Sequence, residues 1–489
     1  MGQGGGVTPG AAGEEPAVAA VPVTAAGQAP ERPPFARSAA LTYGTNVAVA
    51  TLSLVNVLIT SRALGPEGRG HVAFLTTVGY LTAQLATIGV QEAIVNLAGR
   101  RPALSSTLAG NSLVLSLLFG GTAAAAVAVL FVTVPAAGGE SAAWLKAVVL
   151  ASVPMLLLQV FLDHIARAHY RFAASNLAWL LEPVVMVAVV APLAAVGALT
   201  VEAAVLSWIG GQALATVVLA LTVGRRAGGF GRPERSVARE MVTFGVRAHL
   251  GQAMLLGNYR LDAWILGSVA GARELGPYSV AVAWSEALFF LPTALSLVQR
   301  PDLVRAGQDE ARREASAIFR LTVLLTLPLI VGMVALAPFL VVVVFGEGFG
   351  EAVSQLRVLA FAAPGIIALK LFGNALTAQR RPMRETAAIA VSFTTIVALD
   401  VALIPGFGGL GAAAASTVAY TAGGIAAAVI FLRTLSGRPS DLLPQRADVA
   451  TVAEVVRRAR RLLRTGRPAV SPAGHGGAGG DQAQAGADE

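Results

Sequence analysis

The sequence predicts an all-α integral membrane protein with about twelve transmembrane helices. Apolar side chains make up 55% of the 489 residues and charged ones only 13%, and the mean hydropathy is +0.68. Apolar runs of about 18 residues or more, which are long enough to cross a bilayer, alternate with short polar clusters. Along the chain, these polar clusters are alternately rich in arginine and poor in arginine. Together, the three observations indicate a chain that crosses a membrane many times.

We expect twelve spans, each bounded by polar clusters. They extend near residues 38–61, 71–98, 104–134, 142–163, 173–197, 202–224, 241–270, 277–299, 317–345, 353–378, 385–404 and 410–433. Residues 1–34 and 468–489 are of low complexity and are expected to be disordered, because they hold too little apolar surface to offset the entropy of ordering. No signal peptide is visible, so the first apolar segment is expected to remain as the first span.

The spans divide into two related sets of six. A Leu-Gly-Pro turn at residues 64–66 joins the first two spans, and another at residues 275–277 joins the seventh and eighth. An even number of spans per repeat returns the chain to its starting side, so the halves are predicted to be parallel repeats around a central cavity. We expect one six-helix bundle over 35–225, a cytoplasmic linker over 226–240 and a second bundle over 241–434.

Arginine content predicts the orientation. With a cytoplasmic N-terminus, the inside loops contain Arg100, Arg101, Arg167, Arg171, Arg225, Arg226, Arg232, Arg235, Arg239, Arg300, Arg305, Arg312, Arg313, Arg380, Arg381 and Arg384. The outside loops contain only Arg62, Arg69 and Arg273, with Lys146 at a helix start. This asymmetry predicts that both termini are cytoplasmic. Arginine greatly outnumbers lysine, a bias typical of a GC-rich bacterial genome, so the bacterial cytoplasmic membrane is the expected location.

Reporter fusions test this topology directly. A fusion after Arg226 is expected to report the cytoplasm, and a fusion after Gly138 is expected to report the external side. An external signal from the Arg226 fusion would show that the span count is wrong.

Composition and motifs argue against several other classes of protein. The net charge of +8 is dispersed over loops instead of forming one patch, which argues against nucleic-acid binding. Cysteine is absent, so disulfides and cysteine metal sites are excluded, and no metal or cofactor is expected. Residues 65–70 read Gly-Pro-Glu-Gly-Arg-Gly but lack the Lys-Ser/Thr ending of a phosphate loop. No Ser/His/Asp set stands out, and we do not expect an enzyme.

The tail after the last span, residues 435–467, contains a basic amphipathic segment. Between Asp448 and Arg464, valines and leucines recur at roughly helical spacing, and five arginines accompany them. This pattern is typical of a helix lying on the anionic inner leaflet. A solvated basic tail that only follows the orientation rule is the alternative.

Ionisable residues near the bilayer midplane are the best candidates for function, because each is costly there unless it is paired or faces a wet cavity. At about 1.5 Å per helical residue, five residues fall near the midplane: Glu182, Arg260, Asp262, Glu286 and Lys370. In one interpretation, Arg260 and Lys370 pair with Glu286 and Asp262 and hold the second half together. In the other, these residues line a cavity and meet a charged substrate.

Further polar residues in or near the spans complete the candidate set. Arg247 lies at the inner boundary of the seventh span, and Glu92 lies toward the inner face of the second. The amides of Asn46 and Asn258 are suited either to joining helices or to contacting sugar hydroxyls.

Several motifs give the chain a resemblance to a known family. Residues 62–70 read Arg-Ala-Leu-Gly-Pro-Glu-Gly-Arg-Gly, residues 259–262 read Tyr-Arg-Leu-Asp, residues 275–281 read Leu-Gly-Pro-Tyr-Ser-Val-Ala, and residues 345–349 read Phe-Gly-Glu-Gly-Phe. With these motifs placed between twelve spans, residues 36–434 resemble the polysaccharide biosynthesis flippases of the multidrug/oligosaccharidyl-lipid/polysaccharide exporter (MOP) superfamily.

The resemblance implies two six-helix bundles around a V-shaped cavity, with no ATPase site. Such proteins move undecaprenyl-pyrophosphate-linked oligosaccharides to the outer leaflet, driven by an ion gradient or membrane potential, alongside glycosyltransferases and a glycan polymerase. Arg260 and Lys370 would hold the pyrophosphate, with Arg247, Asn258 and Asn46 as further substrate contacts. Asp262 and Glu286 would couple a proton or sodium ion. Unlike lipid II flippases, the chain lacks two further C-terminal helices, which favours capsule or exopolysaccharide units as cargo.

Other functions remain open. A multidrug or metabolite cation exporter would share the fold and use the acidic residues Glu92, Glu182, Asp262 and Glu286, which are equally candidates for ion coupling. An integral membrane glycan polymerase or ligase usually needs a large outer loop, and the outer loops here are short. A scaffold in a glycan-assembly complex would have no use for the costly midplane charges.

Overall fold

The computed structural model describes residues 35–226, 228–289, 303, 305–448, 450–452 and 457. Within these residues all regular structure is helical, which confirms the predicted fold class. The helices of the first half are α1 (Phe35–Leu85), α2 (Val90–Arg100), α3 (Ser105–Leu115), α4 (Gly121–Thr133), α5 (Ala143–Ala168), α6 (Phe172–Ala195) and α7 (Val201–Arg226). Those of the second half are α8 (Arg235–Val269), α9 (Ala272–Ala287), α11 (Gln308–Pro338), α12 (Ala352–Ala360), α13 (Ala363–Ala378) and α14 (Pro382–Thr434).

Two of these helices continue from one predicted span into the next. The break lies at a glycine in the left-handed region, Gly65 in α1 (φ 69°) and Gly408 in α14 (φ 53°). A side chain at either glycine would strain that backbone conformation. Glycine therefore lets the chain turn sharply between consecutive spans.

Two predicted spans are interrupted in the structure. The second, near 71–98, breaks between α1 and α2, where Ile88 and Gly89 both have positive φ. The tenth bends by 42° between α12 and α13. In the described part of the chain, seven helices are long and apolar enough to cross a bilayer, or eight if the bent pair is one span. The count of twelve stays a prediction.

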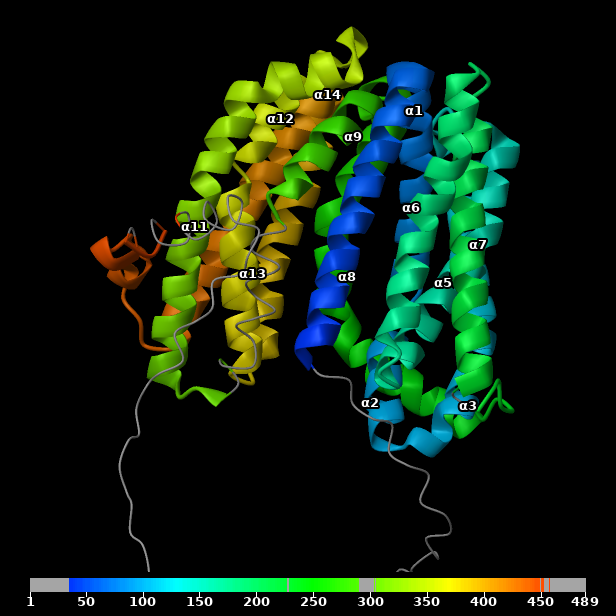
Figure 1. Cartoon of the computed structure of the whole chain (residues 1–489), viewed down its shortest axis with the longest axis horizontal. Helices are drawn as coiled ribbons and strands as arrows, with labels where there is room; N and C mark the ends of the chain where they lie inside the picture. Colours follow the sequence, from blue (N-terminus) through cyan, green and yellow to red (C-terminus); the bar gives the residue numbers. More distant parts are fainter. Residues whose placement is uncertain are drawn as a thin grey trace, which may run out of the picture.

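The helices form two groups that meet at one end of the molecule (Figure 1). Helices α1–α7 gather on one side and α11–α14 on the other, with α8 and α9 between them. Helix α8 packs against both groups. Near its beginning, the backbone of Gly245 approaches Gly89 of the first half so closely that a Cβ on Gly89 would lie 2.1 Å from the Gly245 carbonyl oxygen. Farther along, Gly257 packs on Phe393 of α14.

The two Leu-Gly-Pro turns pack against each other at the end where the halves meet. A Cβ on Gly70 would lie 1.7 Å from the carbonyl oxygen of Ala272, and one on Gly276 would lie 1.9 Å from that of Pro66. Only glycine permits so close an approach of two backbones. The sequence repeat therefore supplies the contact between the halves, with α1 and α9 crossing there (Figure 1).

Arginine side chains add polar contacts at this junction. Arg69 Nε donates to Ser279 Oγ at 3.1 Å. The Arg62 guanidinium donates to the carbonyl oxygens of Val343 and Val344 at 2.6 and 2.7 Å. These hydrogen bonds join α1 to α9 and to the segment that follows α11, so they link the two halves.

Apolar packing continues across the same junction. One cluster of buried side chains includes Phe74 of α1, Trp208 of α7, Leu266 of α8, Tyr278 of α9 and Phe349 just before α12. Between membrane helices such packing stabilises the junction through van der Waals contacts, because lipid tails are as apolar as the side chains. The same packing positions α8 and α9, which carry most of the candidate site.

The segment after α14 folds back onto α11. Arg320 Nε donates to Asp448 at 2.7 Å, and Arg320 Nη1 donates to the Asp441 carbonyl oxygen at 2.5 Å. Both side chains of the Arg320–Asp448 ion pair are about nine-tenths buried. Most of the predicted amphipathic helix over 448–464 lies outside the described residues.

Arg320→Ala is expected to release this segment, because it leaves Asp448 buried without its cation, a loss of about 3–5 kcal/mol. Trypsin cleavage after the exposed Arg446 should become faster, and Arg313→Ala, which removes an exposed arginine of the same helix as Arg320, should not change it. Equal cleavage of both variants would contradict this account.

The same contact has a defined pH dependence. The hydrogen bond from Arg320 is the main cause that lowers the pKa of Asp448 below its ordinary value. A carboxyl group with a lowered pKa in the folded state stabilises that state above its unfolded pKa, near ~3.9, and this stabilisation is lost as the pH falls through the folded pKa. Docking should therefore persist at neutral pH and weaken only below about pH 4.

Candidate substrate and ion sites

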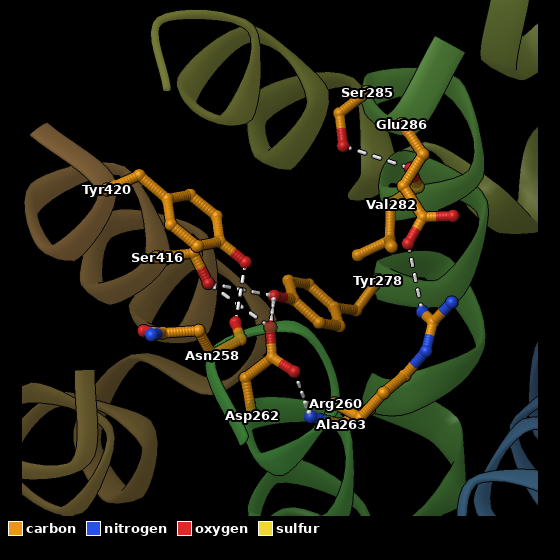
Figure 2. Close-up of polar contacts among 10 residues, drawn as sticks. All are labelled: Asn258, Arg260, Asp262, Ala263, Tyr278, Val282, Ser285, Glu286, Ser416 and Tyr420. Atoms are coloured by element: carbon orange, nitrogen blue, oxygen red, sulfur yellow. Dashed lines mark hydrogen bonds and ion pairs between the residues drawn. The ribbon is translucent and has the colours of Figure 1, made fainter. Parts of the chain in front are cut away.

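Two of the predicted site residues of the second half, Asp262 and Glu286, lie where α8, α9, α12 and α14 meet. A pocket there is lined by Tyr259, Asp262, Tyr278, Val282, Ser285, Glu286, Phe289, Leu359, Ala362, Ser416 and Tyr420. Figure 2 shows two polar groups on different sides of this region, one centred on Asp262 and the other on Arg260 and Glu286. The two carboxylates that the sequence analysis treated together therefore have different surroundings.

Asp262 is buried in a hydrogen-bond network that joins three helices. Its carboxylate accepts hydrogen bonds from Tyr278 Oη of α9 and from Ser416 Oγ of α14, the latter at 3.1 Å. The backbone N–H of Ala263 also donates to it, at 2.7 Å. Its side chain is only 4% exposed. No ion pair to Asp262 occurs within the described residues, and its three hydrogen-bond donors there are neutral.

Asp400 of α14 is a second buried carboxylate, and it is not among the site residues predicted from the sequence. It is fully buried, and neither carboxylate oxygen has a hydrogen-bond partner among the described residues. It lies close enough to Asp262 for the two to interact electrostatically. A buried carboxylate without a partner is costly unless it is protonated or binds a cation.

Arg260 forms an ion pair with Glu286 across α8 and α9. Arg260 Nη1 lies 3.0 Å from Glu286 Oε1 (Figure 2). The side chains are 35% and 37% exposed, so the pair is open on one side. Arg260 does not pair with Asp262, as expected for residues two apart on one helix.

Lys370 of α13 joins this group through aromatic rings. Its ammonium group lies 5.7 Å from the ring centroid of Tyr259 and 5.8 Å from that of Phe289. It is also within electrostatic range of Glu286. The structure therefore brings the two predicted midplane cations to the same carboxylate.

The first half contributes residues to the same region. Tyr80 of α1 interacts electrostatically with Arg260, Glu286 and Glu182, and a side-chain hydrogen bond joins it to Gln84. Glu182, on α6, is partly buried. Tyr80 was not predicted, because a tyrosine within an apolar span gives no sign of which face it occupies. The charged group thus receives residues from both halves.

The remaining candidates have other positions. Asn258 is buried, accepts a hydrogen bond from Ser392 Oγ at 3.1 Å and joins α8 to α14. Asn46 is exposed on α1, and Glu92 is exposed in the first turn of α2. No hydrogen bond or ion pair links Asn46 or Glu92 to Arg260 in the described part of the chain. The side chain of Arg247 lies outside the described residues.

The fold is similar to that of solved membrane transporters. The structure has a TM-score of 0.62 to the lipid II flippase MurJ in its inward closed conformation, at 12% identity, with 82% of this chain and 89% of that chain covered. It has a TM-score of 0.58 to an inward-facing multidrug resistance MATE family transporter, at 16% identity, with 81% and 98% covered.

The particular family follows from the sequence. Residues 59–354 match the family model described as polysaccharide biosynthesis protein, and the chain belongs to this family. It is also 29% identical over 210 residues to the probable flippase AglR of Haloferax volcanii, a match that covers 40% of this chain and 43% of the relative. The chain thus matches less than half the length of this curated relative. The predicted family resemblance is confirmed.

Proposed function

We propose that this transporter flips undecaprenyl-pyrophosphate-linked oligosaccharides from the inner to the outer leaflet of a bacterial cytoplasmic membrane. The observation that carries the proposal is the placement of Arg260 and Lys370 around Glu286, in a partly exposed group that interacts electrostatically with Tyr80 of the other half. Two cations at one place suit a group with two phosphates. Family membership in polysaccharide biosynthesis supports the same cargo.

Movement would follow from alternating access between the halves. The contact through Gly70 and Gly276 holds them together at one end, and side chains of both halves surround Arg260 nearer the middle. Separation of the two Leu-Gly-Pro turns, with both termini cytoplasmic, would open the site to the outer leaflet. A substrate bound between the halves would then cross without passing through the lipid core.

A cation gradient would drive this movement through the buried pair Asp262 and Asp400. Two carboxylates in electrostatic range, one of them without a hydrogen-bond partner, favour uptake of a proton or a sodium ion. The hydroxyl of Ser416 and that of Tyr278 supply neutral oxygens beside them. Glu286 and Glu182 lie with Arg260 instead, so coupling is assigned to Asp262 and Asp400 before them.

A multidrug or metabolite exporter is the second candidate. MATE family transporters have a similar fold, and the carboxylates of Glu182 and Glu286 would attract a cationic drug. Arg260 and Lys370 would oppose such a ligand, and for this reason we place the lipid-linked oligosaccharide first. A glycan polymerase or ligase has no catalytic group in the described site to support it.

Deletion of the gene tests the proposed function in cells. Lipid-linked oligosaccharides made by the upstream glycosyltransferases should accumulate on the inner leaflet, and a polymerase acting outside should receive no substrate. Unchanged surface polysaccharide, together with increased sensitivity to cationic drugs, would support the exporter instead.

A further inference from the structure

We infer that Glu286 is an internal occupant of the substrate-anion site: it holds Arg260 in the empty transporter and is displaced by a phosphate group of the cargo. This inference rests on the proposed function and assigns Glu286 a role in substrate recognition. The ion pair would keep the Arg260 guanidinium in place between transport cycles. It would also set how strongly the cargo must bind to enter.

The first support is the openness of the pair. Two ion pairs of this chain allow a direct comparison: in Arg320–Asp448 the side chains are 8% and 10% exposed, whereas in Arg260–Glu286 they are 35% and 37% exposed. The first pair is closed to any ligand. In the second pair about a third of each side chain is exposed, so an incoming anion can reach the guanidinium.

The second support is the place of Glu286 in its helix. It lies in the last turn of α9, which ends at Ala287. A carboxylate near a helix C-terminus is disfavoured by the exposed carbonyl groups and the helix dipole. The attraction that retains it must therefore come from the cations, Arg260 at 3.0 Å and Lys370 within electrostatic range. Such a carboxylate is suited to exchange with a stronger anion.

The third support is the chemistry of the cargo. Arg260 and Lys370 both act on the carboxylate of Glu286. A pyrophosphate group bears more negative charge than a carboxylate, and its oxygens match the two-pronged geometry of a guanidinium. A pyrophosphate in the place of Glu286 would therefore attract the two cations more strongly than Glu286 does.

Binding of farnesyl pyrophosphate to the full-length protein in lipid nanodiscs tests the inference, with farnesol as the control without phosphates. If Glu286 occupies Arg260 in about nine-tenths of empty molecules, Glu286→Gln should bind farnesyl pyrophosphate about tenfold more tightly. Glu351→Gln removes the same charge at an exposed position away from Arg260 and should leave the affinity unchanged. Arg260→Gln should weaken binding.

A double-mutant cycle identifies the pair responsible. In the Arg260→Gln background, Glu286→Gln should change the affinity less than twofold, because no guanidinium remains to be released. Equal or weaker binding by Glu286→Gln alone, or an equal gain in both backgrounds, would overturn the inference.

If Glu286→Gln does not fold, Glu286→Asp replaces it. The shorter side chain of aspartate reaches Arg260 less well and should give a smaller gain in affinity, and no gain would overturn the inference. Equal binding by the unmodified protein and Arg260→Gln, or no binding by either, would instead overturn the proposed function.

Discussion

Arg260→Ala and Lys370→Ala are each expected to abolish export of the polysaccharide while the protein stays folded in the membrane. Each change removes a charge-assisted contact to the pyrophosphate, worth about 1.5–3 kcal/mol, or roughly 10–100-fold in affinity. Flipping of a lipid-linked oligosaccharide by the purified variants measures this loss.

The chain offers a matched control for the lysine. Lys146, the only other lysine, also lies over an aromatic ring, with its ammonium group 5.9 Å from the centroid of Phe131. Lys146→Ala should leave flipping within about twofold of the unmodified protein, since Lys146 lies away from the Arg260 pair. Normal export from both Arg260→Ala and Lys370→Ala would refute their assignment to the substrate.

Asp262→Asn and Asp400→Asn are expected to uncouple flipping from the ion gradient. The carbonyl oxygen of an asparagine at 262 can still accept hydrogen bonds from Tyr278 and Ser416, although the bond from the Ala263 N–H is lost. The network that joins α8, α9 and α14 should therefore survive. At position 400 the change removes a buried carboxylate without a partner, and the melting temperature should hold or rise. Flipping without a gradient should continue, but imposing a proton or sodium gradient should no longer accelerate it.

The coupling role and a purely structural role give different results. A structural carboxylate would lower the melting temperature when replaced and leave the gradient response of each folded molecule unchanged. Glu286→Gln provides the comparison, because it breaks the partly exposed ion pair with Arg260, and the gradient response should persist. Loss of the response in that variant, with a normal response in both aspartate variants, would transfer coupling to Glu286.

Much of the fold follows from the sequence because hydropathy and arginine distribution report directly on membrane helices. The Leu-Gly-Pro repeat predicts two related halves, and the structure places Gly70 and Gly276 at their contact. The break after α1 was not predicted, because hydropathy is insensitive to backbone angles, and only positive φ values at Ile88 and Gly89 reveal it.

The site could be predicted only in part because sequence gives depth along a helix more readily than rotation about it. The depth estimated from the sequence puts Arg260 and Glu286 both near the bilayer midplane, and in the structure they form an ion pair. Asp262 lies one layer away but faces Tyr278 and Ser416, so the expected pairing with a cation does not occur among the described residues. Asp400 was not predicted as a site residue, and it interacts electrostatically with Asp262.

Reconstitution into proteoliposomes tests the central claim most directly. A fluorescent undecaprenyl-pyrophosphate-linked oligosaccharide is placed in one leaflet, and its transfer to the other is followed with and without an ion gradient, beside export of a cationic dye. The account predicts transfer of the lipid-linked oligosaccharide that depends on the protein and is accelerated by the gradient, with no export of the dye. Gradient-driven export of the dye without transfer of the lipid would contradict it.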